Sequence, residues 1–225
     1  MPDNIGVLGG TFDPVHRGHL HLAIKTQMAF RLARIYFVVA QTPPHKVNNE
    51  ISNVYHRFAM VCLALSPYPT FFTSSVELEL GASPYTIDTL DVLSRRLRIP
   101  PHSMFFIAGG DSFECIQTWK NYQELLTEYN VLFVERHGSQ IDGQKLPQEI
   151  RERVLDLRPE GVHFQPPSVV QKGEQDKSKV FLLDVGAPPI SSTAIRGSRD
   201  PDSDPSDKVP KIVACYIKKH QLYRS

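Results

Sequence analysis

Cysteine is scarce in this chain, and its few cysteines lie far apart. The 225 residues include only Cys62, Cys115 and Cys215, with no Cys-x-x-Cys spacing. An odd number of widely separated thiols argues against both a disulfide framework and a cysteine-based zinc site. The sequence therefore predicts a protein of a reducing compartment, and we expect it in the cytoplasm.

The chain also lacks long hydrophobic runs and an excess of charge. No apolar run approaches the ~20 residues of a membrane-spanning helix, and the N-terminus has no basic region followed by a signal-like apolar segment. Lys and Arg number 25 against 24 Asp and Glu, which gives a formal net charge of +1. Because this balance provides no broad basic surface, we expect neither a nucleic-acid nor a membrane partner, and any phosphate site must be local.

Two common nucleotide-binding fingerprints are missing as well, the Walker A loop and G-x-G-x-x-G. The N-terminal region has instead the segment 5–20, IGVLGGTFDPVHRGHL. Its apolar beginning predicts a strand, and apolar residues at helical spacing from Leu20 onward predict a helix. Gly9 and Gly10 let the backbone approach a ligand closely, and the helix N-terminus offers N–H groups to an anion. The segment therefore predicts a phosphate-sized cradle.

His16 and His19 lie three residues apart on one side of the first turn of this predicted helix. Taken alone they allow three interpretations: a structural pair, a metal pair with His21 as third ligand, or hydrogen-bond donors to a phosphate. No H-E-x-x-H or carboxylate-rich pattern supports zinc, whereas the glycine turn supports an anion. We expect no metal ion held by the protein itself.

The rest of the chain alternates apolar runs with amphipathic segments, which predicts an α/β fold with a doubly wound, mainly parallel, Rossmann-like sheet and right-handed crossovers. We treat residues 1–225 as one domain with a helical portion from about 190. Arg57, in the second predicted helix, is expected at the surface. The predicted extended segments are 35–40, 70–73, 76–80, 104–108, 131–134, 162–164 and 180–183, and the predicted helices are a first one ending near 31, then 53–65, 84–96, 147–157 and 209–220.

Two polar loops follow predicted strands, at the edge where open α/β sheets bind ligands. In Pro43-Pro44-His45-Lys46, the prolines stiffen the approach of Lys46, a candidate phosphate contact. In Gly109-Gly110-Asp111-Ser112, the carboxylate of Asp111 has two alternatives: it accepts hydrogen bonds from a ribose, or it caps the next helix.

A third polar segment, Ile190-Ser191-Ser192-Thr193-Ala194-Ile195-Arg196, lies late in the chain. Three hydroxyl residues at a helix start suit N-capping, and the same geometry presents hydroxyls and N–H groups to an anion. Arg196 comes four residues after Ser192 and returns to the same face with a planar fork suited to phosphate.

These motifs together resemble a known family. Residues 9–20, GGTFDPVHRGHL, are similar to the H-x-G-H signature of the nucleotidyltransferase superfamily of adenylyl- and cytidylyltransferases. With the segments 43–46, 109–119 and 190–196 in the same order, the chain resembles the bacterial nicotinate-nucleotide adenylyltransferases, least between 138 and 180. The resemblance implies transfer of AMP from MgATP to nicotinate mononucleotide, giving deamido-NAD and pyrophosphate in NAD biosynthesis, by direct in-line attack without a covalent enzyme intermediate.

The resemblance also implies roles for particular residues. It gives His16, His19, Lys46 and Arg196 catalytic roles and leaves Mg²⁺ held mainly by the ATP phosphates. Trp119 would stack on the nicotinate ring, beside a helix that starts near Pro84, where the family has a serine. The implied ATP contacts are Gly9, Gly10, Thr11, Phe12, His16, His19, Gly109, Asp111, Ile190, Ser191, Ser192 and Arg196, and the implied nicotinate mononucleotide contacts are His45, Lys46, Tyr85, Thr86 and Trp119.

Several alternatives share parts of this pattern. A pantetheine-phosphate adenylyltransferase or a cytidylyltransferase would also carry the histidine motif, but Pro-Tyr-Thr at 84–86, Trp119 and the segment 190–196 favour a pyridine nucleotide. A non-catalytic nucleotide-binding regulator would not need His16, His19 and Arg196 intact. A metal-dependent hydrolase would require tightly bound zinc or manganese. The sequence leaves open whether the protein is a monomer or a homo-oligomer.

Overall fold

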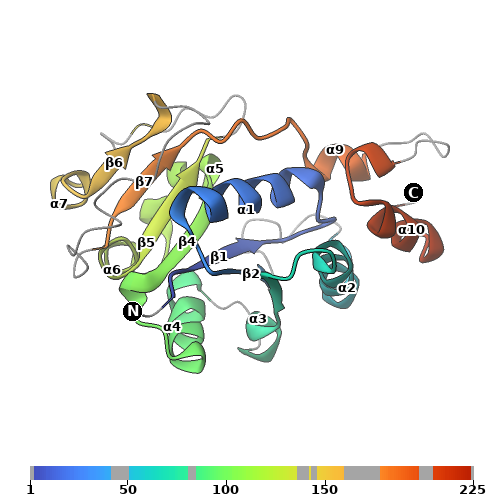
Figure 1. Ribbon diagram of the computed structural model, residues 1–225, viewed down its shortest axis with the longest axis horizontal. Helices are drawn as coiled ribbons and strands as arrows, with labels where there is room; N and C mark the ends of the chain where they lie inside the picture. Colours follow the sequence, from blue (N-terminus) through green and yellow to red (C-terminus); the bar gives the residue numbers. More distant parts are fainter. Residues whose placement is uncertain are drawn as a thin grey trace.

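The computed structural model describes residues 3–41, 51–80, 85–135, 142, 146–159, 178–197 and 205–223. Within them, seven strands form one sheet in the order β3-β2-β1-β4-β5-β7-β6 (Figure 1), and every neighbouring pair is parallel. This arrangement confirms the predicted doubly wound α/β sheet. The strands are β1 (Ile5–Gly10), β2 (Arg34–Val39), β3 (Phe71–Ser74), β4 (Met104–Gly109), β5 (Asn130–Val134), β6 (Val154–Asp156) and β7 (Val180–Leu183).

Helices cover both faces of the sheet, because successive strand side chains point to opposite sides. Phe105 packs in the cluster formed with α1, α2 and α10, whereas its neighbour Phe106 packs in the cluster formed with α4, α5 and α6. The α-helices described are α1 (Arg17–Phe30), α2 (Val54–Leu65), α3 (Val76–Leu80), α4 (Thr86–Leu97), α5 (Gly110–Glu114), α6 (Tyr122–Glu128), α7 (Gln148–Arg151), α9 (Ser192–Arg196) and α10 (Lys211–Lys219). None of these helices is long and apolar enough to cross a membrane.

The centre of the sheet is the point where the strand order reverses. β1 pairs with β2 on one side and with β4 on the other, with Leu8 opposite Ile107. The glycine turn after β1 and the glycine loop after β4 therefore leave the sheet at the same edge. In open α/β sheets the crevice at such a switch point is where ligands bind.

Two of the predicted elements were wrong. Residues 76–80 form the helix α3 instead of an extended segment: the Ser75 carbonyl accepts a hydrogen bond from the Glu79 N–H at 3.1 Å, and the Ser74 hydroxyl accepts one from the Val76 N–H at 3.4 Å. The predicted helix over 147–157 is only α7, after which β6 pairs with β7. Pairing with the buried strand β7 outweighs the helical pattern there. The predicted strand over 162–164 lies outside the described residues.

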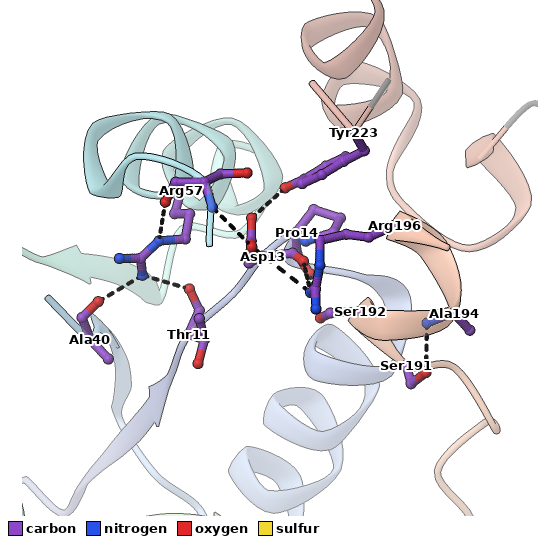
Figure 2. Close-up of polar contacts among 11 residues, drawn as sticks. Thr11, Asp13, Pro14, Ala40, Arg57, Ser191, Ser192, Ala194, Arg196 and Tyr223 are labelled. Atoms are coloured by element: carbon purple, nitrogen blue, oxygen red, sulfur yellow. Dashed lines mark hydrogen bonds and ion pairs between the residues drawn. The ribbon is translucent and has the colours of Figure 1, made fainter. Parts of the chain in front are cut away.

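Arg57 is buried, so the expectation of a surface position was wrong. Only 1% of the residue is exposed, and its guanidinium donates to four backbone carbonyl oxygens: Nε to Ser52 at 3.0 Å, Nη1 to Thr11 at 2.8 Å and Ala40 at 2.7 Å, and Nη2 to Gln41 at 3.0 Å. Figure 2 shows the hydrogen bonds to Thr11 and Ala40. The side chain thereby ties the end of β1 to the end of β2 and to the segment before α2.

Replacing Arg57 with methionine tests this tie. Methionine fills similar space but leaves four carbonyl groups without their donor, so we expect the free energy of unfolding in urea to fall by about 3 to 5 kcal/mol. Arg95→Met is the matched control, since Arg95 is exposed and donates within its own helix, to Asp91 O. Equal small losses in the two variants would contradict a clamping role for Arg57.

Candidate active site

His16 and His19 form one unit at the start of α1. His16 occupies the N-cap position and is 2% exposed, and its ring centroid lies 3.7 Å from that of His19. The His16 backbone N–H donates to Nδ1 of His19 at 3.2 Å. Because Nδ1 accepts this hydrogen bond, neutral His19 carries its ring proton on Nε2, where it is a hydrogen-bond donor.

Glycines allow the aromatic rings of this segment to pack tightly. A Cβ atom at Gly18 would lie 3.0 Å from Cε1 and Nδ1 of His16, and one at Gly10 would lie 2.9 Å from the ring of Phe12. Phe12 is 1% exposed, and its ring packs against the His19 ring in a T-shaped arrangement, at 5.0 Å between centroids. The Phe12 side chain therefore supports His19 from the core, and a contact of Phe12 with a nucleotide must use its backbone.

The late segment that includes α9 docks onto the turn before α1 (Figure 2). The Ser192 hydroxyl donates to Pro14 O at 3.0 Å, and Nη1 of Arg196 donates to Asp13 O at 2.7 Å. The structure thus brings Ser192 and Arg196 beside the start of α1, from 178 and 183 residues away along the chain. In this arrangement the Ser192 hydroxyl donates its proton to the Pro14 backbone carbonyl.

The first hydroxyl of this segment has a structural role. Ser191 is the N-cap of α9, and its Oγ accepts a hydrogen bond from the Ala194 N–H at 3.1 Å, as the capping interpretation predicts. Ile190 lies just before this cap, and its carbonyl oxygen is 3.8 Å from the position that a Gly18 Cβ would take. The residues from 190 to 196 therefore line one side of the α1 N-terminus.

The loop after β4 faces the same sheet edge. Gly109 is the N-cap of α5, so the alternative that Asp111 caps this helix was wrong. Asp111 lies exposed in the first turn of α5. Within the described residues, no three His, Cys, Asp or Glu side chains converge as a metal site. His45, Lys46 and Pro84 lie outside the described residues.

Three of the five predicted nicotinate mononucleotide contacts, Tyr85, Thr86 and Trp119, lie on the α4 side of the glycine turn. Phe106 lies 3.4 Å from the position of a Gly9 Cβ and meets Trp119 edge to face at 6.1 Å between ring centroids. Nε1 of Trp119 is buried and has no hydrogen-bond partner among the described residues. Tyr85 is the N-cap of α4. The ammonium nitrogen of Lys120, the residue after Trp119, lies over the Tyr85 ring at 4.9 Å from its centroid.

A buried carboxylate that sequence reasoning missed stands in the glycine turn. Asp13 is 1% exposed, and its carboxylate accepts hydrogen bonds from the Tyr223 hydroxyl at 2.7 Å and from the Ser52 N–H at 3.2 Å. Arg196 Nη1 lies 3.8 Å from the same carboxylate. In the sequence Asp13 stands between apolar residues, Phe12 on one side and Pro14-Val15 on the other. This sequence context could have indicated that Asp13 is buried.

Glu77 joins two parts of the site that are far apart in the sequence. From α3 its carboxylate accepts hydrogen bonds from the Gln41 N–H at 3.4 Å, at the end of β2, and from the Thr89 hydroxyl at 3.2 Å, on α4. Burial raises the pKa of Glu77 from its ordinary 4.5 to about 7, although these two hydrogen bonds and the charge of Arg57 act in the opposite direction. The carboxyl group therefore titrates near neutral pH.

This raised pKa predicts a pH-dependent stability. The folded protein holds the Glu77 proton between pH 4.5 and about 7, whereas the unfolded chain releases it, so folding stability falls as the pH rises through this window. Relative to Glu77→Gln, the wild-type free energy of unfolding should decline by on the order of 3 kcal/mol between these pH values. Glu79→Gln, at an exposed position of the same helix, is the control: it keeps Glu77, so its free energy of unfolding should decline over this pH range as that of the wild type does. Parallel pH profiles for wild type and Glu77→Gln would contradict the prediction.

The comparisons with known proteins agree with this geometry. A family model described as cytidylyltransferase-like matches residues 7–198. The probable nicotinate-nucleotide adenylyltransferase of Citrifermentans bemidjiense is 36% identical over 222 residues, 97% of each chain. That of Desulfotalea psychrophila is also 36% identical over 222 residues, which cover 97% of this chain and 99% of its own.

Solved structures share the fold. The Plasmodium falciparum nicotinic acid mononucleotide adenylyltransferase complexed with NaAD matches with a TM-score of 0.69 at 19% identity, over 99% of this chain and 98% of that chain. The family model covers most of the chain, and the relatives above match it over nearly their full length. This chain therefore belongs to the nicotinate-nucleotide adenylyltransferase family, within the cytidylyltransferase-like nucleotidyltransferases.

Proposed function

We propose that this protein transfers AMP from MgATP to nicotinate mononucleotide, releasing pyrophosphate and forming deamido-NAD in NAD biosynthesis. The observation that carries the proposal is the convergence of the His16–His19 pair and Arg196 on one turn at the switch point of the sheet. The names of the relatives and the NaAD held by the Plasmodium falciparum structure support the pyridine substrate.

In the proposed reaction, a phosphate oxygen of nicotinate mononucleotide attacks the α-phosphorus of ATP. A new O–P bond forms as the bond from the α-phosphorus to the pyrophosphate oxygen breaks, so the protein needs no nucleophile of its own. The Nε2–H of His19 and the N-terminus of α1 would stabilise charge that develops on the α-phosphate. Arg196 would exchange the Asp13 carbonyl for the β- and γ-phosphates, which its planar fork suits.

The pyridine ring would lie between the start of α4 and Trp119. Backbone N–H groups in the first turn of α4, around Thr86, and the positive end of the helix dipole suit the carboxylate of the acid form. An amide would direct its NH₂ group at these donors. We therefore propose that the acid is preferred over nicotinamide mononucleotide.

Two further parts of the proposal concern the metal and the compartment. Mg²⁺ would enter with ATP, bound mainly by its phosphates, and would neutralise part of their charge. We propose a cytoplasmic location, which the three free thiols of Cys62, Cys115 and Cys215 support.

Alanine substitutions of the two histidines test their role. If each acts like one oxyanion-hole donor, His16→Ala and His19→Ala should each lower turnover by roughly 10² to 10³, measured as pyrophosphate release. His21→Ala is the matched control, because the ring of His21 lies on the same helix and bonds Val185 O at 2.9 Å. Turnover near the wild-type value in both His16 and His19 variants would refute the assignment.

A panel of acceptors tests the reaction itself. With MgATP fixed, we expect kcat/KM for nicotinate mononucleotide to exceed that for nicotinamide mononucleotide by roughly tenfold to a hundredfold, the cost of an unpaired polar group. Phosphopantetheine should not be adenylylated. Preference for phosphopantetheine would indicate the pantetheine-type reaction, and equal values for the two mononucleotides would remove the proposed role of the α4 N-terminus.

A further inference from the structure

We propose that Tyr223, near the C-terminal end of the chain, is a positioning residue that orients Arg196 through the buried carboxylate of Asp13. The proposal rests on the proposed role of Arg196 toward the ATP phosphates. It assigns a function to the contact between the C-terminal segment and the glycine turn, which Figure 2 shows.

The first step is the charge of Asp13. A carboxylate that is 1% exposed must have hydrogen bonds and opposite charge around it, because isolated buried charge is strongly unfavourable. Its Oδ1 accepts from the Tyr223 hydroxyl at 2.7 Å, while Oδ2 accepts from the Ser52 N–H at 3.2 Å and lies 3.8 Å from Nη1 of Arg196. The two oxygens thus have different neighbours, and Oδ2 is the one turned toward Arg196.

The second step is that Tyr223 remains a donor. Burial raises the pKa of the Tyr223 hydroxyl, and the charge of Asp13 and the hydrogen bond to it raise that pKa further. The hydroxyl therefore keeps its proton at physiological pH and fixes the rotation of the carboxylate. Without it, Oδ1 would lose its partner, and the carboxylate would turn to satisfy both oxygens from Ser52 and Arg196.

The third step links this rotation to Arg196. In this structure the guanidinium is held by the Asp13 carbonyl at 2.7 Å and only loosely by Oδ2 at 3.8 Å. A carboxylate released by Tyr223 could form a closer ion pair with Arg196 and draw the fork away from the phosphates. Tyr223 would therefore keep Asp13 from competing with ATP for Arg196.

The chain offers a matched control for a merely structural effect. Tyr216, on α10, uses its hydroxyl to bond Nδ1 of His56 on α2 at 2.9 Å. Both tyrosines thus tie the C-terminal region to the rest of the protein by one hydroxyl, but only Tyr223 contacts Asp13. Tyr216→Phe reports the effect of loosening this region.

The experiment measures kcat/KM for ATP and, separately, for nicotinate mononucleotide by pyrophosphate release. We expect Tyr223→Phe to lower kcat/KM for ATP roughly tenfold, the scale of one hydrogen bond to a charged group, with KM for the mononucleotide within about twofold of wild type. Tyr216→Phe should leave both kcat/KM for ATP and KM for the mononucleotide within about twofold of the wild-type values. Added to Arg196→Lys, Tyr223→Phe should cause little further loss, because both changes affect the same contact.

Each outcome decides the question. If Arg196→Lys lowers kcat/KM for ATP but Tyr223→Phe behaves like Tyr216→Phe, the positioning role is wrong and the proposed function stands. If Arg196→Lys itself has no effect on ATP use, the proposed role of Arg196 fails. Fully multiplicative losses in the double variant would show that Tyr223 acts independently of Arg196.

A second variant covers the case in which Tyr223→Phe does not fold. Asp13→Asn keeps the shape of the side chain and an oxygen that can accept from Tyr223, but it removes the charge near Arg196. We expect kcat/KM for ATP to rise, by up to roughly tenfold, because no charge at residue 13 then competes with ATP for Arg196, while KM for the mononucleotide stays little changed. A fall in kcat/KM for ATP, or an equal effect on both substrates, would overturn the proposal.

Discussion

Two buried charges of opposite sign, Asp13 and Arg57, hold the loops around the β1 to α1 turn. Each is 1% exposed, and burial at this level is tolerated only when hydrogen bonds and opposite charge compensate it. Their partners come from distant segments: Arg57 reaches the ends of β1 and β2, while Asp13 reaches Ser52 and Tyr223. Satisfying these two groups therefore fixes the relative position of four loops, and the proposed substrate cradle lies among them.

The fold was predictable because its strands are buried on both faces. Continuous apolar runs such as 35–40 and 104–108 have no other stable place in a protein of this size, and their alternation with helices leads to a parallel sheet. The errors fell on short segments. Residues 76–80 carry a pattern too short to separate helix from strand, and local hydrogen bonds to Ser74 and Ser75 form a helical turn there. In 147–157, pairing of β6 with β7 replaces the helical pattern after α7.

The site was predictable only where its signal is local. The glycine turn, the two histidines and the Ser192–Arg196 pair each lie within a few residues, so their spacing could be read directly. Asp13 and Tyr223 were missed because their contact spans 210 residues. Arg57 was missed although it lies three residues after Val54 and four before Val61, in the inward register of α2.

The way Arg196 is held suits a group that must exchange partners. Its closest acceptor is a neutral carbonyl, and the nearby carboxylate of Asp13 is already bonded by Tyr223 and Ser52. If Arg196 turns toward an incoming polyphosphate, as we propose, Asp13 keeps its bonds to Tyr223 and Ser52 and does not become an unpaired buried charge, so the cost of releasing the arginine stays low. His19 differs, because packing against Phe12 and His16 sets its ring before any substrate arrives. In the proposed reaction the site would thus combine a fixed donor at the reacting phosphate with a cation that can change partners at the leaving group, a division of roles that suits preorganised catalysis.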